Sequence, residues 1–369
     1  MPHAAIDLLS LGNNLRVLRD YLAADTKIMA AVKGNAYGHG ACEIATHLES
    51  CGVEAFGVAT AAEALALRHS GITANILIFS PVFEQLSELI DCNITLTVAN
   101  SESVTAIAAS GATRTAQVHL KVDTGMGRLG LDWQNSIQLA LEIARTPSIE
   151  LEGVWTHLAR ADEGAVEHTH QQLDLFNNVL DALEKEGLRP PLVHAANSAA
   201  IISYRNSHFN MVRPGIALYG YHSSPTIAKY EPKLKPIMSL SAPITFVKAV
   251  QAGTPISYGG LWTATTDTVI ATVRCGYADG YPRGLSNLGH VQFSNRCLKV
   301  AGRVCMDQMM VDAGDSGIAV GDRVELFGPE GPDLVQLAAS IGTISYELLT
   351  SISARVKRTY MSSQNKPLL

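Results

Sequence analysis

Charged side chains, paired cysteines and long apolar runs are all scarce in this chain of 369 residues. Only 17% of the residues are charged, the net charge is −6 and no long basic run occurs, which argues against nucleic acid or an anionic membrane as a partner. The six cysteines form no CxxC pair, which favours free thiols over disulfides or structural zinc. No apolar stretch could span a bilayer, and the N-terminus lacks the pattern of a secretory signal. We therefore expect a cytoplasmic protein.

The first two thirds of the sequence alternate between short apolar runs and amphipathic stretches, within a composition that is 47% hydrophobic. Eight apolar runs occur, near residues 28–33, 55–59, 75–80, 94–98, 116–123, 151–158, 192–197 and 211–218. A helical pattern follows each of them, although the last is weak. This rhythm predicts a (β/α)₈ barrel. A doubly wound sheet is the alternative, but no GxGxxG follows the first strand.

The sequence pattern changes at about residue 238, where prolines and glycines separate short runs of β-branched residues. These runs predict a mostly β C-terminal domain with one late helix over residues 333–342. We therefore place a barrel domain at residues 1–237 and a β domain at residues 238–369, with the first few residues as candidates to join the second domain. The two prolines of residues 230–238 indicate the linker.

The segment AVKGNAYGHG, residues 31–40, brings one lysine to the end of the first apolar run. Lys33 is followed by small residues, and a helical pattern begins at about Ala41. An amine at the end of a buried strand, before a glycine-rich turn, is suited to forming a Schiff base. Taken alone, such a lysine is more often one that extends from a strand end into water.

Polar residues gather at the predicted C-terminal ends of several other barrel strands. They are Lys121, Asp123, Arg128, His157, His194, Asn197, Ser198 and Arg213. In a barrel these strand ends converge on one face, which carries the chemistry. The cluster therefore predicts an active site without a metal ion.

A phosphate site is predicted after the seventh and eighth strands. Gly215 and Ile216 offer backbone N–H groups there, and Ser198 offers a hydroxyl. A phosphate at this position, together with Lys33, fits pyridoxal 5′-phosphate bonded to the lysine. A sugar-phosphate enzyme that uses Lys33 as a base remains the alternative.

Eight motifs carry a more specific resemblance, in order and across nearly the whole chain. They are AVKGNAYGHG, KVDTGMGRLG, THLARADE, HAANSAA, VRPGIALYG, GYADGYPR, GRVCMDQMMVD and ISYELLTSISARVKR. Together they resemble the alanine racemase family. The resemblance implies a barrel plus a β domain, pyridoxal phosphate on Lys33, and a homodimer whose active sites are shared between subunits.

Racemisation requires removal of the Cα proton on one face and its return on the other, which two acid/base groups achieve most simply. The resemblance implies that these groups are Lys33 and, from the partner subunit, Tyr277. It also implies that His157 and Arg213 support the tyrosine through a hydrogen-bonded chain. A tyrosine has a pKa of about 10 and needs cationic neighbours to act as a base near neutrality. Without the motif, Tyr277 would be an ordinary strand-end tyrosine.

The remaining roles also follow from the resemblance. Arg213 is expected to face the ring nitrogen of the cofactor, and an arginine there should suppress side reactions such as transamination. The other cofactor-binding residues implied are Tyr37, His194, Asn197, Ser198, Gly215, Ile216 and Tyr346. Arg128 and Met306 are expected to bind the substrate carboxylate, and Lys121 is a candidate for carbamylation.

The function predicted is the interconversion of L- and D-alanine, which would supply D-alanine for peptidoglycan. A broad-specificity racemase of the same fold is one alternative, since a pocket rejects one extra methylene by only roughly 1–3 kcal/mol. A non-catalytic pyridoxal phosphate carrier is another, but carriers lack the second domain and with it Tyr277. A basic amino acid decarboxylase would place a carboxylate opposite the ring nitrogen, where this chain has Arg213.

Overall fold

The computed structural model describes residues 1–229, 233–363 and 366–367, in two compact units. The barrel unit comprises residues 12–36 and 41–234, and the β unit comprises residues 1–11, 37–40 and 235–369. Of the predicted linker at 230–238, residues 230–232 lie outside the described residues, and Met238 already begins a strand.

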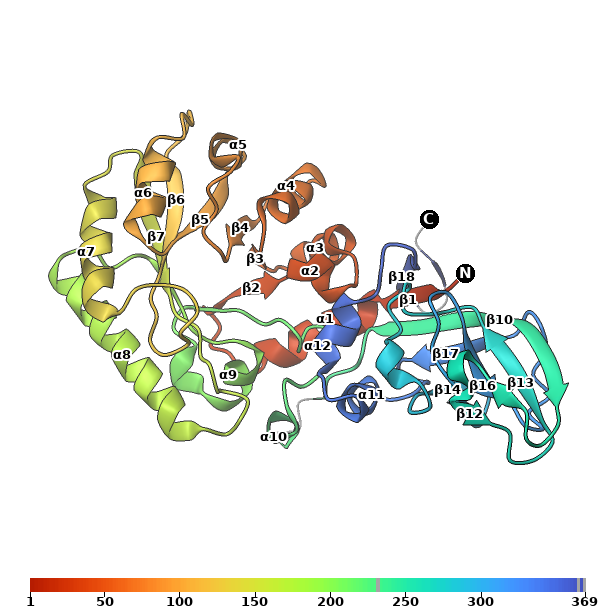
Figure 1. Cartoon of the computed structure of the whole chain (residues 1–369). Coiled ribbons are helices and arrows are strands. Elements are labelled where there is room, and N and C mark those ends of the chain that lie inside the picture. Colours follow the sequence, from red (N-terminus) through yellow and green to blue (C-terminus); the bar gives the residue numbers. More distant parts are fainter. Residues whose placement is uncertain (230–232, 364–365, 368–369) are drawn as a thin grey trace. The chain divides into compact units, whose positions relative to one another are not determined.

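Eight parallel strands close into a barrel, so the predicted (β/α)₈ fold is confirmed (Figure 1). They are β2 (Lys27–Ala31), β3 (Ala55–Val58), β4 (Asn75–Ile78), β5 (Ile94–Val98), β6 (Ala116–Lys121), β7 (Ile149–Trp155), β8 (Leu192–His194) and β9 (Met211–Val212). Each strand pairs with the next, and β2 pairs with β9. Such strands are covered on both faces, which is why they appear in the sequence as continuous apolar runs.

Helices connect the barrel strands and lie outside them (Figure 1). They are α3 (Ala41–Ser50), α4 (Ala61–His69), α5 (Leu86–Asp91), α6 (Ser101–Ala108), α7 (Trp133–Ala144), α8 (Val166–Lys185) and α9 (Ser198–Ser203). After β9 comes only the short α10 (Pro225–Ala228), in line with the weak last pattern. Helix α1 (Leu8–Arg19) begins in the β unit and ends in the barrel unit.

Side chains fill the inside of the barrel. Met29, Ala55, Leu77 and Met211 form one buried cluster with Leu192, and Phe79 packs against it. Gly57 leaves the space that the ring of Phe79 occupies, because a Cβ on Gly57 would lie 2.0 Å from that ring. The barrel is therefore a packed core rather than a pore.

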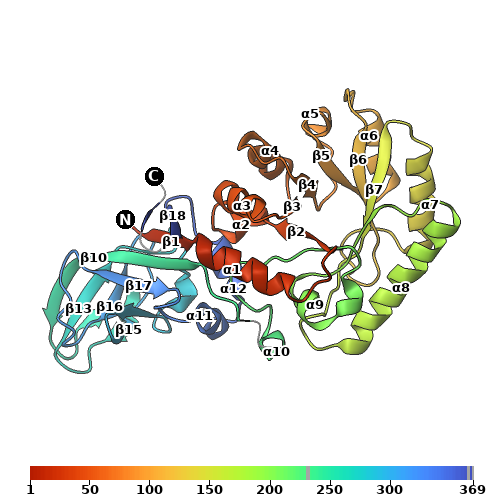
Figure 2. The ribbon, with the colours of Figure 1, turned by 180° about the vertical axis from the view of Figure 1, so that it is seen from behind.

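One large sheet dominates the β unit, and strand β1 (His3–Asp7) lies inside it between β10 and β18 (Figure 2). The sheet order is β13-β16-β15-β14-β17-β10-β1-β18-β19, with a further pairing of β13 and β10. Its other strands are β10 (Met238–Val250), β13 (Thr268–Val273), β14 (His290–Phe293), β15 (Arg296–Val300), β16 (Met309–Asp312), β17 (Arg323–Phe327), β18 (Lys357–Ser363) and β19 (Lys366–Pro367). All its pairings are antiparallel except that of β1 with β18.

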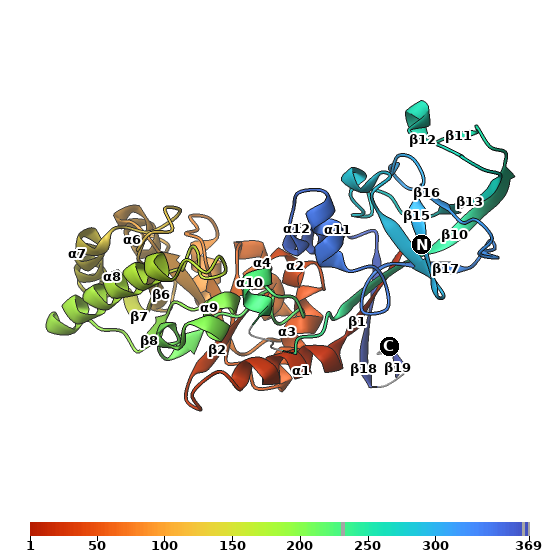
Figure 3. The same cartoon turned by 90° about the horizontal axis from the view of Figure 1, so that it is seen from below.

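Two described helices, not one, follow β17 (Figure 3). Earlier in the chain, β11 (Pro255–Ile256) and β12 (Trp262–Thr263) form a separate two-stranded sheet. Helix α11 (Leu334–Ser340) matches the predicted late helix. The prediction of a single helix was wrong, because α12 (Ser345–Thr350) also forms. It has only six residues and no side-chain cap at Ile344, so it carries almost no sequence signal.

Residues 37–40 belong to the β unit and are held there by close backbone contacts. A Cβ on Gly38 would lie 2.0 Å from the carbonyl oxygen of Leu349, so only glycine fits. Arg358 donates to the carbonyl oxygen of Gly38 at 2.8 Å, and Tyr360 donates to that of His39 at 3.0 Å. The lysine motif therefore begins in one unit and ends in the other.

Candidate functional site

The chain takes an unusual path directly after Lys33. Gly34, Asn35, Ala36 and Tyr37 all have φ between 53° and 63°, a single turn of left-handed helix. Each non-glycine residue in that conformation costs roughly 1–2 kcal/mol, so the surrounding structure must hold the turn in place. A hydrogen bond of 2.7 Å from the Ala36 N–H to the carbonyl of Val32 closes the turn.

Glu63, near the start of α4, is the residue that holds this turn from outside. Its carboxylate accepts hydrogen bonds from the backbone of Gly34 at 2.6 Å and of Ala59 at 2.8 Å. It also raises the pKa of Lys33, against larger effects from burial and from Arg128 that lower that pKa overall. A lysine with a lowered pKa is uncharged more of the time and is a better nucleophile.

Arg213 follows the last residue of β9 and is only 4% exposed. It donates to His194 Nδ1 at 2.8 Å and to the carbonyls of Thr156 at 2.8 Å and Ala195 at 3.0 Å. Its second terminal nitrogen also lies 3.3 Å from His157 Nδ1. Burial lowers the pKa of Arg213 to about 9, so it remains a cation at neutral pH.

His157 and His194 are both neutral because burial and the charge of Arg213 hold the pKa of each well below its usual value. The nitrogen of Arg213 nearest His157 has two hydrogens, which it donates to the carbonyls of Thr156 and Ala195. Its longer contact of 3.3 Å with His157 Nδ1 favours a ring proton on Nε2, because a donor on Nδ1 would face a cation.

Lys121 is the last residue of β6 and is 2% exposed. Its amine lies 5.2 Å from the ring centre of Trp155, and the guanidinium of Arg213 lies 4.9 Å from the same ring. Burial lowers the pKa of Lys121 to about 8, opposed by Asp123 and assisted by Arg213 and Arg128. Arg128 is exposed and also lowers the pKa of Lys33 and His157, which places its charge over the same strand ends.

The predicted phosphate site lies where α9 begins. Ser198 Oγ accepts from the backbone N–H of Gly215 at 2.8 Å and of Ala217 at 3.3 Å, so its own hydrogen is available to an acceptor. Asn197 caps α9 and donates to the carbonyl of Leu158. Within the described residues the buried N–H of Ile216 has no acceptor. Two available donors in a buried place fit a phosphate oxygen.

The β unit carries the other predicted site residues. Tyr277 and Met306 are 43% and 54% exposed and lie on neighbouring turns, because the Tyr277 N–H donates to the Cys305 carbonyl and the Ala278 N–H to the Met306 carbonyl. Gly276 allows this approach, since a Cβ there would lie 2.4 Å from the Met306 oxygen. In the same unit the rings of Tyr37 and Tyr346 lie 5.9 Å apart.

The structure therefore brings Lys33, Lys121, His157, His194 and Arg213 together at one end of the barrel strands. Lys33, His157 and Arg213 come one or two residues after their strands end, rather than on them as predicted. Glu63 and Trp155 were not predicted from the sequence. Across the part of the chain that the structure describes, no cluster of three or more potential ligands could hold a metal ion.

The fold, and the cluster of basic and imidazole side chains at the C-terminal ends of the barrel strands, define a class of protein: (β/α)₈-barrel enzymes with a mostly antiparallel β C-terminal domain. Residues 6–223 match the family description "Alanine racemase, N-terminal domain", and residues 237–360 match "Alanine racemase, C-terminal domain". The chain belongs to the alanine racemase family, whose members are pyridoxal-phosphate-dependent isomerases.

Individual relatives agree with this placement. An alanine racemase of Methanococcus maripaludis is 40% identical over 97% of this chain and 98% of its own length. The structure of alanine racemase from Clostridium difficile 630 matches with a TM-score of 0.96 and 39% identity, over 100% of this chain and 97% of that one. A structure of the Bacillus anthracis enzyme with bound L-Ala-P matches with a TM-score of 0.94 and 34% identity, over 100% of this chain and 96% of that one.

Proposed function

We propose that this chain interconverts L- and D-alanine, with pyridoxal phosphate held on Lys33. The observation that carries the proposal is that Lys33 and Arg213 lie at the same end of the barrel. The half-buried amine of Lys33 has a lowered pKa, and the buried Arg213 donates to a neutral histidine and to backbone carbonyls. When bound, the cofactor withdraws electrons from the substrate and so acidifies the proton on Cα. The acid/base residues of the protein then determine on which face of Cα the proton is removed and returned.

Lys33 serves as the acid/base group on one face and Tyr277 of the partner subunit serves on the other. The lowered pKa of Lys33 favours the unprotonated amine that can accept a proton. The Nε2–H of neutral His157 is available to the tyrosine oxygen, and Arg213 fixes the orientation of that imidazole.

Arg213 faces the ring nitrogen of the cofactor and directs the reaction toward racemisation. It is a cation that can only donate a hydrogen bond, so it leaves the ring nitrogen unprotonated and weakens the electron sink. Replacing it by glutamate (Arg213→Glu) should raise transamination products relative to racemisation. An unchanged product ratio would show that this residue does not control the outcome.

The remaining contacts divide between cofactor and substrate. Ser198 and the backbone of Gly215 and Ile216 hold the phosphate, with the hydroxyls of Tyr37 and Tyr346 contributed from the β unit and His194 and Asn197 as neighbours. Arg128 and the backbone of Met306 hold the alanine carboxylate. The barrel domain at 1–237 and the β domain at 238–369 would both contribute to the site, with residues 1–11 and 37–40 joining the β unit.

Lys121 carries a carbamate that pairs with Arg128. A lowered pKa of about 8 supports this assignment, because carbon dioxide reacts only with the uncharged amine. Loss of carbon dioxide from protein kept at low bicarbonate, with activity restored by added bicarbonate, would support the modification. Activity that is indifferent to bicarbonate, with an intact mass that shows unmodified Lys121, would exclude it.

The active protein is a homodimer in the cytoplasm that supplies D-alanine for peptidoglycan. Exposure of Tyr277 and Met306 on the β unit supports the dimer, because site residues of this kind need a covering surface. Among the described helices, none is both long and apolar enough to cross a membrane.

Incubation of the purified protein with L-alanine, with and without added pyridoxal phosphate, tests the proposed reaction. We expect cofactor-dependent formation of D-alanine until the two enantiomers are equal. Binding of the cofactor without turnover of alanine would contradict the assignment, and turnover of serine or larger amino acids at equal rates would favour the broad-specificity racemase.

A further inference from the structure

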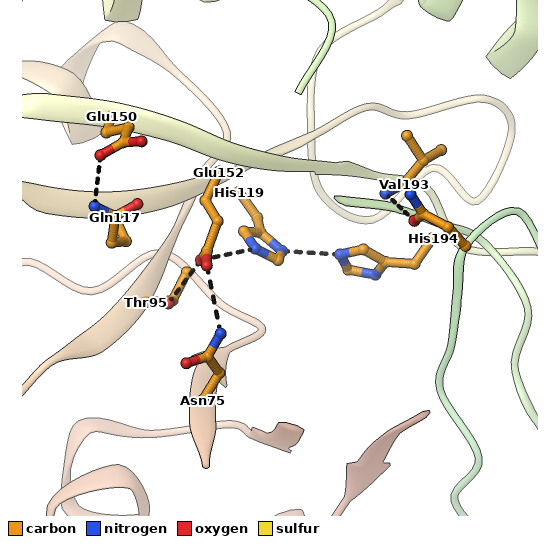
Figure 4. Close-up of polar contacts among 9 residues, drawn as sticks. Asn75, Thr95, Gln117, His119, Glu150, Glu152, Val193 and His194 are labelled. Carbon is orange, nitrogen blue, oxygen red and sulfur yellow. Dashed lines mark hydrogen bonds and ion pairs between the residues drawn. The ribbon is translucent and has the colours of Figure 1, made fainter. Parts of the chain in front are cut away.

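A row of polar side chains runs inside the barrel from Glu152 to Arg213, and Figure 4 shows its first three members, Glu152, His119 and His194. Glu152 Oε2 lies 3.3 Å from His119 Nε2, and His119 Nδ1 lies 2.8 Å from His194 Nε2. His194 Nδ1 in turn lies 2.8 Å from a terminal nitrogen of Arg213. The row joins strands β7, β6 and β8 to the residue that follows β9.

The direction of every proton in this row follows from Arg213. Arginine only donates, so Nδ1 of His194 is an acceptor and its single proton is on Nε2. That proton points to His119 Nδ1, which is then also an acceptor, so the proton of His119 is on Nε2 and faces Glu152. The hydrogen bonds therefore run donor to acceptor from the guanidinium through His194 to His119. The Nε2 atom of His119 lies 3.3 Å from the Glu152 carboxylate, an ion-pair distance whose geometry does not make a hydrogen bond.

Glu152 supplies a charge that Arg213 otherwise lacks. Among the described residues, no carboxylate forms an ion pair with Arg213, and its acceptors are two imidazoles and two backbone carbonyls. The contact with His119 lowers the pKa of Glu152 more than burial raises it, so Glu152 is ionised. Thr95 also donates to it at 3.2 Å, Asn75 donates at 3.4 Å, and Lys27 contributes its charge.

Two local features of β7 build the row. The register between β6 and β7 shifts so that Val118 faces Leu151 and His119 faces Gly153, which leaves Glu152 as the extra residue of a bulge. Bulges redirect side chains relative to the strict alternation of a strand. Gly153 leaves room for the histidine, because a Cβ there would lie 2.6 Å from Nε2 of His119.

Side chains that only filled space would need neither the bulge at Glu152 nor the glycine at 153. A buried polar group costs free energy unless all of its partners are present, and apolar side chains of similar volume would pack the barrel interior as well. His194 also stacks on Trp155, with 5.8 Å between ring centres and 6° between ring planes. The ring of Trp155 thus fixes the position of the His194 imidazole, and His119 fixes its tautomer.

We propose that His119 and Glu152 are positioning residues for Arg213. His119 keeps the proton of His194 on Nε2, so that Nδ1 continues to accept from the guanidinium, and Glu152 balances the buried positive charge. Without the acceptor on His119, the proton could move to Nδ1 of His194 and the arginine would face a donor. This inference rests on the proposed function, in which Arg213 faces the ring of the cofactor.

Three variants separate the two parts of the proposal. His119→Phe removes the acceptor, His119→Asn keeps an acceptor near the position of Nδ1 but cuts the contact with the carboxylate, and Glu152→Gln keeps an acceptor but removes the charge. Glu150→Gln is the matched control, since this nearby carboxylate of β7 is exposed and contacts Gln117 outside the row (Figure 4).

The measurements are the absorption spectrum of the bound cofactor, its dissociation constant and kcat with alanine, each on protein with a measured thermal unfolding midpoint. We expect kcat to fall about 10- to 100-fold in His119→Phe, with a shifted cofactor spectrum, as is common for groups that orient a residue in contact with a reacting centre. His119→Asn should recover most of that loss, Glu152→Gln should show a smaller loss of the same kind, and Glu150→Gln should match the unmodified protein.

The proposal is overturned if the folded His119→Phe and Glu152→Gln variants match Glu150→Gln in spectrum, cofactor affinity and kcat. A lowered unfolding midpoint without any change in the spectrum would likewise overturn it, because the row would then be only structural. If His119→Phe does not fold, the comparison of the other two variants with the control decides. The spectrum and the dissociation constant need no turnover, so a failure of the proposed reaction remains distinguishable from a failure of this inference.

Discussion

Two pairs of predicted site residues, one pair from the barrel unit and one from the β unit, differ in their burial. In the barrel unit Lys121 and Arg213 are almost fully buried, and Arg213 donates to His194 and to two backbone carbonyls, whereas Lys121 donates to the carbonyl of Val122. In the β unit Tyr277 and Met306 are largely exposed. Arg213 is thus oriented by contacts within the barrel unit, whereas the exposed Tyr277 and Met306 are accessible to the partner surface that the proposed dimer requires.

The largest expected effect is the loss of Lys33 from the barrel unit. Lys33→Ala should lower the rate of alanine racemisation by roughly 10⁴-fold or more, because it removes both the cofactor linkage and one acid/base group. D-alanine formation and the absorption of the bound cofactor would measure this. Lys185→Ala, which removes an exposed lysine at the end of α8, is the control and should retain activity. Equal losses in both variants would contradict the assignment.

Removal of one hydroxyl from the β unit comes next. Tyr277→Phe should lower kcat by roughly 10²- to 10³-fold, since it deletes one of two acid/base groups while leaving cofactor binding intact. Tyr258→Phe alters another exposed tyrosine of the same unit and should have no effect. A Tyr277→Phe variant that racemises alanine at the normal rate would exclude Tyr277 of the β unit as an acid/base group.

A third prediction concerns the turn that holds Lys33. Glu63→Gln should destabilise the protein by about 1–3 kcal/mol, because the neutral amide is a weaker acceptor for the N–H groups of Gly34 and Ala59. Chemical denaturation measures the loss, and cofactor affinity should fall with it. Glu43→Gln, on the exposed face of α3, serves as the control. Unchanged stability and cofactor affinity in Glu63→Gln would mean that the left-handed turn is held by other contacts.

The smallest expected effect is the dependence of stability on pH. Burial lowers the folded-state pKa of His157 and His194 below the unfolded value of 6.5, so the unfolded chain binds more protons as the pH falls through that value. Stability present above pH 6.5 should therefore be lost below it, by about 1.4 kcal/mol per pH unit for each histidine. Thermal unfolding between pH 7.5 and 5.5 measures this, and His157→Asn should reduce the slope while His69→Gln, an exposed position, should not. A melting temperature that does not change over this range would contradict the burial of neutral histidines.

Residues that end a barrel strand could be predicted from the sequence, whereas residues placed by a turn or a bulge could not. The eight strands are visible because each is buried on both faces, and Lys121 and His194 end their strands as expected. Glu63 could not be found, because its partners lie in a left-handed turn at Gly34 that has no sequence rule. Glu152 was also missed, since only a one-residue bulge brings its side chain to His119.

The most direct test of the account is whether the two units of one site come from different subunits. Lys33→Ala and Tyr277→Phe, each with little activity alone, are mixed and allowed to exchange subunits. Half of the dimers become hybrids, and each hybrid has one intact site, so activity should recover to roughly one quarter of the unmodified level. No recovery, with exchange verified by mass, would contradict a site shared between the barrel unit of one subunit and the β unit of its partner.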